Sequence, residues 1–297
     1  VVKHAVYQPD WTNRERLKYT MDVAHLQAKL LPVGVVGTIS TVPLGWQEPT
    51  GSLFGRCAPL LSECAAGLRQ LEESTGVKIR LCLEPEPGCA LQTSDQVVEL
   101  FGQHLFANPA TEPTNREYLG VCHDVCHAAV MFETQQEVLA RYDDAGIAIG
   151  KVQISSAPEW QGDRHESGLE AIRSFVEPRY LHQTSIRTNS DQHFFEDLPL
   201  ALEDARSCGP NAVWRTHFHV PVMLPDIDQR LGTTQDDINS CLSWFLEQNY
   251  ASHFEIETYA WEVSPRSVQG GTMVDSIAAE LSWLQQRFPD LANLNMA

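Results

Sequence analysis

The sequence YLGVCHDVCHA, residues 118–128, decides the fold class of this 297-residue chain. Its first half is short and mostly apolar, which is typical of a buried strand, and the segment that follows, to Tyr142, has the pattern of a helix. His123, Asp124 and His127 place three ionisable side chains where the strand gives way to the helix. Loops at the C-terminal ends of parallel strands carry the chemistry of α/β folds. Asp124 is therefore predicted to belong to a metal site.

The same strand-then-helix pattern occurs six times along the chain. Strands that alternate with helices indicate parallel pairing and an α/β fold. Residues 178–197 interrupt the alternation and predict an extra strand or hairpin, inserted before the strand at 213–222. No linker divides the sequence, so residues 1–297 are predicted to form a single domain. The expected strands span residues 35–44, 77–87, 118–124, 147–156, 213–222 and 253–263.

Polar side chains gather near the C-terminal ends of these strands, whereas a buried parallel strand is usually apolar. Strand periodicity places His217 with His219, and Glu255 with Glu257, on one face of their respective strands. Carboxylates that converge repel one another unless a cation neutralises them. Oxygen-rich sets suit Mg²⁺, Mn²⁺ or a similar hard ion. Glu86 and Glu262 are interpreted as solvated loop acids. The polar residues at the strand ends are Glu84, His123, Asp124, Gln153, His217, His219, His253, Glu255 and Glu257.

Composition excludes several classes of partner. The formal net charge of −18 argues against nucleic acid or an anionic membrane as a general partner, because both require a basic face. No stretch approaches the ~20 apolar residues of a membrane span. The eight cysteines include no paired CxxC pattern, which favours buried thiols in a reducing compartment and predicts a cytoplasmic protein. Cys122 and Cys126 remain an alternative pair of metal ligands.

Several motifs resemble known families. LCLEPEP (81–87), DVCH (124–127) and GKVQIS (150–155) resemble motifs of the xylose isomerase-like TIM-barrel superfamily of sugar isomerases and epimerases, and the last is similar to the hydroxypyruvate isomerase branch. PDW, GTISTVPLGW, CHDVCHAAVMFE, THFHVPV and ETYAWEV together resemble the EboE family, which is linked to metabolite traffic. The resemblance implies a (β/α)₈ barrel without its first two β-α units. Either the chain is truncated or its barrel is open and another element covers the exposed edges.

The resemblance also implies roles for single residues. Glu84 and Glu257 match the acid/base pair that removes and returns a substrate proton. Glu255 is the other register for the last metal ligand. The implied metal ligands are Glu84, Asp124, Gln153 and Glu257. The substrate-binding residues that we expect are His127 and Arg164, from the resemblance, and His217 and His219, which match no ligand position.

These roles predict a divalent-metal-dependent isomerase or epimerase that moves a proton in a small hydroxy-carbonyl metabolite. The alternative is a non-catalytic protein that binds a metabolite in the same pocket and assists its transport, since fold does not fix function. A metal-dependent phosphodiesterase or nuclease is the least favoured alternative, given the net charge of −18. The expected partners are a small metabolite and either a second copy of the chain or other proteins of a metabolite-traffic system.

Overall fold

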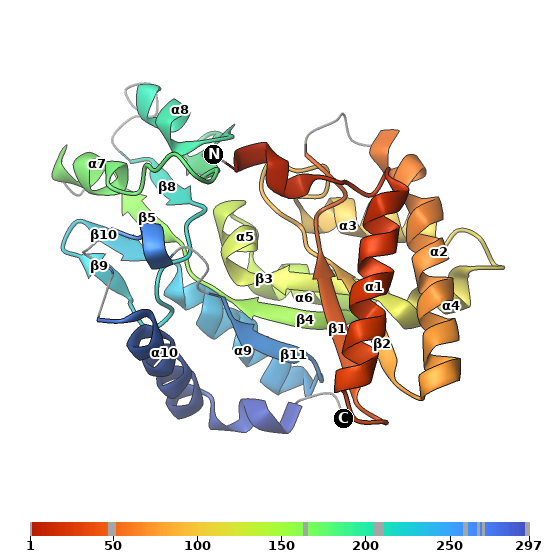
Figure 1. Ribbon diagram of the computed structural model, residues 1–297. Helices are drawn as coiled ribbons and strands as arrows, with labels where there is room; N and C mark the ends of the chain where they lie inside the picture. Colours follow the sequence, from red (N-terminus) through yellow and green to blue (C-terminus); the bar gives the residue numbers. More distant parts are fainter. Residues whose placement is uncertain are drawn as a thin grey trace.

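A parallel sheet forms the centre of the molecule and confirms the α/β prediction (Figure 1). The computed structural model describes residues 2–46, 52–162, 166–204, 211–257, 261–265, 268 and 271–294. Within these ranges the parallel sheet has five strands in the order β1-β2-β3-β4-β11. Its strands are β1 (Val36–Thr41), β2 (Lys78–Leu83), β3 (Leu119–Asp124), β4 (Ile149–Ile154) and β11 (His253–Ile256).

Helices pack against the sheet and against one another. Leu61 and Leu68 of α2 belong to the same buried cluster as Ile79 and Leu81 of β2, so the main core lies between helix and sheet. No described helix is both long and apolar enough to cross a membrane. The α-helices are α1 (Arg14–Leu30), α2 (Ser52–Thr75), α3 (Ser94–Leu100), α4 (Glu112–Tyr118), α5 (Val125–Val130), α6 (Gln135–Asp144), α7 (Glu166–Arg173), α8 (Leu198–Glu203), α9 (Gln235–Gln248) and α10 (Met273–Arg287). The remaining helical turns are η1 (Lys3–Tyr7), η2 (Phe101–Leu105), η3 (Trp261–Val263) and η4 (Pro289–Leu294).

A second, antiparallel sheet contains six strands in the order β7-β6-β8-β5-β10-β9. The hairpin of β6 and β7 confirms the extra strands predicted within residues 178–197. This sheet has its own hydrophobic core, in which Trp160, Ile186 and Trp214 are buried. Its strands are β5 (Pro158–Gln161), β6 (Thr184–Arg187), β7 (Gln192–Phe195), β8 (Val213–Thr216), β9 (Asp226–Asp228) and β10 (Leu231–Thr233).

The prediction that residues 213–222 form a parallel strand of the central sheet was wrong. The strand β8 ends at Thr216 and pairs antiparallel with β5 and β6. Its apolar side chain Trp214 packs against Trp160, with ring centroids 5.4 Å apart, in the second core. The hydrophobic pattern predicted the strand, but it does not indicate which of the two cores the strand joins. As a result β11 pairs directly with β4, and the described sheet has five parallel strands rather than six.

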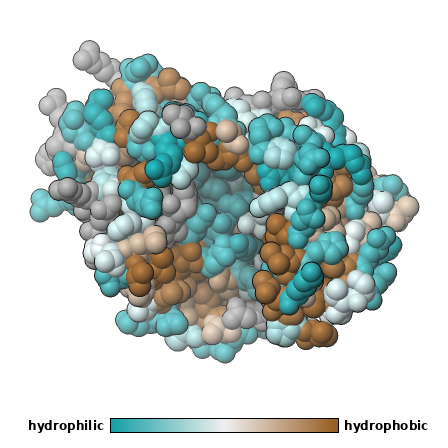
Figure 2. Space-filling model, viewed as in Figure 1, coloured by the Kyte–Doolittle hydropathy of each residue, from teal (hydrophilic) through white to brown (hydrophobic). Residues whose placement is uncertain are grey.

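The parallel sheet curls, and its two edge strands meet through side chains. Thr38 Oγ1 of β1 lies 2.9 Å from His253 Nδ1 of β11. Asp124, Gln153 and Glu255 occupy matching register positions on β3, β4 and β11, so their side chains share the concave face. Figure 2 shows a hollow on this side of the molecule with a largely hydrophilic floor. Polar residues thus lie close together at the C-terminal ends of the strands, as the sequence predicted.

Candidate functional site

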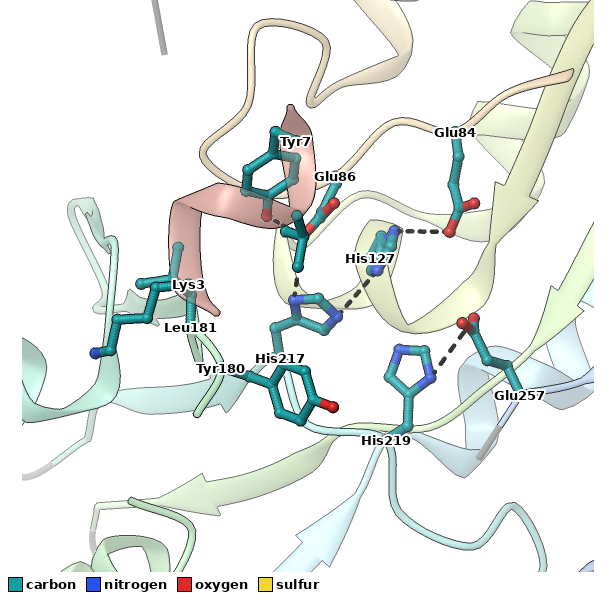
Figure 3. Close-up of a pocket in the computed structure, with 11 residues that line it drawn as sticks. Lys3, Tyr7, Glu84, Glu86, His127, Tyr180, Leu181, His217, His219 and Glu257 are labelled. Atoms are coloured by element: carbon teal, nitrogen blue, oxygen red, sulfur yellow. Dashed lines mark hydrogen bonds and ion pairs between the residues drawn. The ribbon is translucent and has the colours of Figure 1, made fainter. Parts of the chain in front are cut away.

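A cavity of about 240 Å³ contains most of the predicted site residues (Figure 3). Glu84, which follows β2, and Glu257, which follows β11, line it together with His127, His217 and His219. The N-terminal turn η1 and the segment before β6 supply other parts of its wall. The cavity therefore lies at the C-terminal ends of the parallel strands, where α/β folds bind their ligands.

Asp124 is held in place by hydrogen bonds at the junction of β3 and α5. Its Oδ1 accepts from the backbone N–H of His127 at 2.9 Å, which caps α5, and from Ser155 Oγ at 2.8 Å. Its Oδ2 lies 3.9 Å from Nε2 of His219. The carboxyl group of Glu257 is close enough for the charge of Asp124 to raise its pKa. Asp124 is thus fully buried, with one oxygen used for structure and the other facing an imidazole and a second carboxyl group.

His127 and His217 form a pair whose proton positions follow from the hydrogen bonds. The carbonyl of Pro87 can only accept, so the Gln183 amide must direct its nitrogen to it, at 3.1 Å. The Gln183 oxygen then accepts from Nδ1 of His217 at 2.7 Å. Nδ1 of His127 donates to the carbonyl of Pro85 at 2.9 Å, and its Nε2 lies 3.0 Å from Nε2 of His217. Two lone pairs at that contact would repel, so one ring carries both protons, and that ring is His127 because its pKa is raised whereas the pKa of His217 is lowered.

We expect Gln183→Leu to free the His217 ring from this arrangement and to destabilise the protein. The change removes the acceptor for Nδ1 of His217 and the donor to Pro87, and each orphaned buried group costs about 1–3 kcal/mol. Nitrogen-15 NMR of the histidine rings should show a mixture of His217 tautomers, and urea unfolding should show the loss of stability. Gln192→Leu, at an exposed position of the same hairpin, is the matched control. A wild-type His217 tautomer in Gln183→Leu would contradict the assignment.

Two predicted ligands, Gln153 and Glu255, are not among the described residues that line the cavity. The Gln153 oxygen accepts a hydrogen bond from the Cys122 thiol at 3.0 Å, and Gln153 is not among the described residues that line the cavity. Glu255 forms an ion pair with Lys151 at 2.5 Å and is also absent from that wall. Arg164 lies outside the described residues. His123 is buried and bonds Gln135 at 2.7 Å, away from the cavity. Of the two registers for the last strand, the geometry therefore favours Glu257 over Glu255.

The interpretation of Glu86 as a solvated loop acid was wrong. Its Oε1 accepts from the Tyr7 hydroxyl at 2.6 Å and from the Gln183 amide at 3.0 Å, and it lies 3.8 Å from Nδ1 of His217. The signal was present in the sequence, because the proline after Glu84 favours an extended backbone that turns Glu84 and Glu86 to one side. Tyr7 and Gln183 carried no such local signal, since 176 residues separate these two hydrogen-bonded side chains.

The carboxyl groups of the site have strongly shifted pKa values. Burial raises the pKa of Glu84 to about 8, against the opposing effect of His127. Burial and the nearby Asp124 raise the pKa of Glu257 to about 11. Burial alone would raise the pKa of Asp124 as well, but His127 and His219 outweigh it and lower this pKa to about 2. At neutral pH the Asp124–Glu257 pair therefore holds one proton, on Glu257, and one negative charge, on Asp124.

The histidine rings of the site also have shifted pKa values. Burial lowers the pKa of His219 to about 4, although Asp124 opposes that effect, so this ring is neutral at pH 7. Burial, followed by the proximity of His127, lowers the pKa of His217 well below its usual value. The pKa of His127 is raised because Asp124, Glu86 and Glu84 outweigh its burial, so this ring carries both protons.

Among the residues that the structure describes, three overlapping groups of side chains have ligand atoms close enough to share a metal ion, because the atoms of each group all lie within 4.8 Å of one another. Asp124, His127 and His219 each belong to two of these groups. Carboxyl groups that are buried and protonated at neutral pH are suitable metal ligands, because a bound cation takes the place of the proton that each of them loses. The groups are Glu84 with Asp124 and His127, Asp124 with Cys126 and His219, and His127 with His217 and His219.

Comparisons with known proteins identify no family. No protein-family model matches the chain, so the resemblance to the EboE family is not confirmed. No curated protein matches it either. Among solved structures, the chain is similar to one described as a 1.8 Å crystal structure of IOLI protein with a binding zinc atom, at 14% sequence identity and a TM-score of 0.42. The match covers 94% of this chain and 69% of that one. A likeness this distant carries no argument about function.

Proposed function

We propose that this chain is a divalent-metal-binding protein of the xylose isomerase-like type that isomerises or epimerises a small hydroxy-carbonyl metabolite by proton transfer. The observation that carries the proposal is the pair Glu84 and Glu257, which come from different strands of one curved sheet and line the same cavity. Both have a pKa raised well above the usual value for glutamate. Perturbed carboxyl groups in a cleft are characteristic of acid/base sites.

The proposed metal ligands are the carboxylates of Glu84, Asp124 and Glu257, with the amide of Gln153 as the fourth. The buried ionised Asp124 beside two acids that hold protons supports a cation at this position. Such an oxygen-rich set suits Mg²⁺, Mn²⁺ or a similar ion. A bound divalent ion would polarise the substrate carbonyl and stabilise negative charge on its oxygen.

Glu84 and Glu257 would move the proton. One carboxylate accepts the proton from the carbon next to the carbonyl, and the other carboxyl group returns a proton to the neighbouring carbon or to the opposite face. His127, His217 and His219 line the same cavity and would contact substrate there. The cavity volume of about 240 Å³ is compatible with a small metabolite.

Elemental analysis of the purified protein tests the metal, before and after chelation. We expect about one equivalent of a divalent ion, lost with the chelator and regained on dialysis against metal. A screen of small sugars and keto-acids in deuterium oxide then tests the reaction, because proton transfer to carbon incorporates deuterium from solvent. Protein that binds metal and metabolite but incorporates no deuterium would support the non-catalytic alternative, a metabolite carrier in the traffic context that the EboE resemblance implies.

A further inference from the structure

The cavity has a second polar region, which Tyr7, Glu86 and Gln183 form. The Tyr7 hydroxyl donates to Oε1 of Glu86 at 2.6 Å, and the Gln183 amide donates to the same oxygen at 3.0 Å. Figure 3 shows Tyr7 and Glu86 on the other side of the cavity from Glu257. Tyr7 belongs to η1 and Gln183 to the segment before β6, so two of the three residues lie outside the parallel sheet. None of the three takes part in the proposed proton transfer.

Both donors are fixed in direction. The nitrogen of the Gln183 amide also donates to the carbonyl of Pro87 at 3.1 Å, and its oxygen accepts from His217, so this amide cannot turn over. The Tyr7 oxygen accepts from the Gln183 amide at 3.2 Å, which leaves the phenolic proton for Glu86. Oε1 of Glu86 therefore receives two hydrogen bonds that the surrounding contacts hold in place.

The second oxygen of Glu86, Oε2, has no hydrogen-bond partner among the described residues, and it is not enclosed by them. The Glu86 side chain is 16% exposed and lines the cavity. The 2.6 Å bond from Tyr7 has the length of a charge-assisted hydrogen bond to a carboxylate. Burial raises the pKa of Glu86, but the charge of His127 and the hydrogen bonds from Tyr7 and Gln183 lower it. Oε2 can therefore accept a hydrogen bond from a ligand in the cavity.

The lysine of the cavity wall is already paired. Lys3 is the only lysine or arginine among the described residues that line the cavity, and its Nζ lies 2.5 Å from Oδ2 of Asp197. A ligand carboxylate or phosphate beside Glu86 would face a carboxylate with no lysine or arginine left to balance it, and an uncompensated charge is costly in such surroundings. A ligand hydroxyl would instead donate to Oε2. This region thus favours an uncharged ligand end that carries a hydroxyl group.

We propose that Glu86 binds a hydroxyl group of the substrate, and that the substrate is a small uncharged hydroxy-ketone or hydroxy-aldehyde rather than a keto-acid or a sugar phosphate. This rests on the proposed function, because it names the substrate class of that same site. Tyr7 and Gln183 are positioning residues, which hold the carboxylate with one oxygen toward the ligand. A site that hydrogen-bonds a hydroxyl group rejects analogues without it, because its own polar group is then left unpaired.

Isothermal titration calorimetry of the full chain at saturating Mg²⁺ tests the substrate class by binding rather than by activity. Three probes share one hydroxy-carbonyl group. They are L-erythrulose, its deoxy analogue with hydrogen in place of the hydroxyl farthest from the carbonyl, and the phosphate ester of that hydroxyl. Wild type should bind erythrulose at least about tenfold more tightly than either of the other probes.

Glu86→Gln should change the order of affinities. The donors from Tyr7 and Gln183 require an acceptor, so the new amide oxygen takes the place of Oε1 and the amide nitrogen points to the ligand. This variant has no charge to repel phosphate, and it should bind the phosphate ester at least about tenfold more tightly than wild type does. Glu133→Gln is the matched control and should keep the wild-type order, because Glu133 bonds Ser94 and is not in the described cavity wall.

Equal affinity of wild type for erythrulose and its deoxy analogue, or tighter binding of the phosphate ester, would overturn the assignment of Glu86. Absence of binding for all three probes, or the wild-type order in Glu86→Gln, would overturn it as well. The wild-type results decide the question even if Glu86→Gln does not fold. Deuterium uptake tests the proposed function separately. The expected order of affinities without uptake contradicts isomerisation alone, and uptake with the phosphate ester as the preferred ligand contradicts the substrate class alone.

Discussion

Glu257→Gln is expected to lower deuterium uptake into substrate by about 10²–10⁴-fold, which is the usual contribution of one general acid or base. Glutamine has nearly the shape of glutamate but neither removes nor returns a proton. The variant should keep its fold, because Glu257 is protonated and uncharged at neutral pH in the metal-free protein. The measurement is the rate of deuterium incorporation by mass spectrometry, on whichever substrate the screen identifies, at saturating metal.

Glu255→Gln is the matched control for this experiment. It makes the same chemical change two residues earlier, at a side chain that is paired with Lys151 and does not line the cavity. Its exchange rate should stay within a few-fold of wild type. Equal exchange in wild type and Glu257→Gln would remove Glu257 from the proton-transfer pair. A large loss in Glu255→Gln alone would show that the strand uses the other register.

The parts of this site that the sequence predicted are those with a local signal. Glu84 and Glu257 directly follow parallel strands and Asp124 ends one, and polar residues at the ends of such strands are conspicuous. All the strands that form the parallel sheet fall inside the predicted ranges. These inferences depend on the pattern of a few adjacent residues, so one sequence was enough.

The parts that were missed depend on contacts between distant segments. Trp214 packs in the second core, and β8 therefore belongs to the antiparallel sheet and not to the parallel sheet. The predicted helix from Ala128 to Tyr142 is divided where Phe132 has a left-handed backbone, φ 58°. Gln183, just before β6 in the insertion, accepts a hydrogen bond from His217, which follows β8. Such pairings leave no periodicity in the sequence, because each depends on which surfaces meet after folding.

The stability of the metal-free protein should fall as the pH rises from 6.5 to 8. The pKa values of Glu84, about 8, and Glu257, about 11, both lie above the usual 4.5, so the folded protein binds more protons than the unfolded chain across this range. The raised pKa of His127 acts in the same direction. Below pH 6.5 the lowered pKa values of His217 and His219 have the opposite effect, which is why the test begins there. Each carboxyl group contributes at most about 1.4 kcal/mol per pH unit.

Metal should reverse this dependence, because carboxylates bind a cation only after losing their protons and affinity therefore rises with pH. Urea unfolding in the presence of a chelator should give a free energy that decreases toward pH 8, and a saturating divalent ion should restore it most strongly at that pH. Glu84→Gln and Glu257→Gln should each flatten the metal-free profile, whereas Glu255→Gln should not. A metal-free profile that is flat in wild type would mean that burial does not keep these carboxyl groups protonated in the folded state. The cost of ionising them there is the physical reason for placing a cation among them.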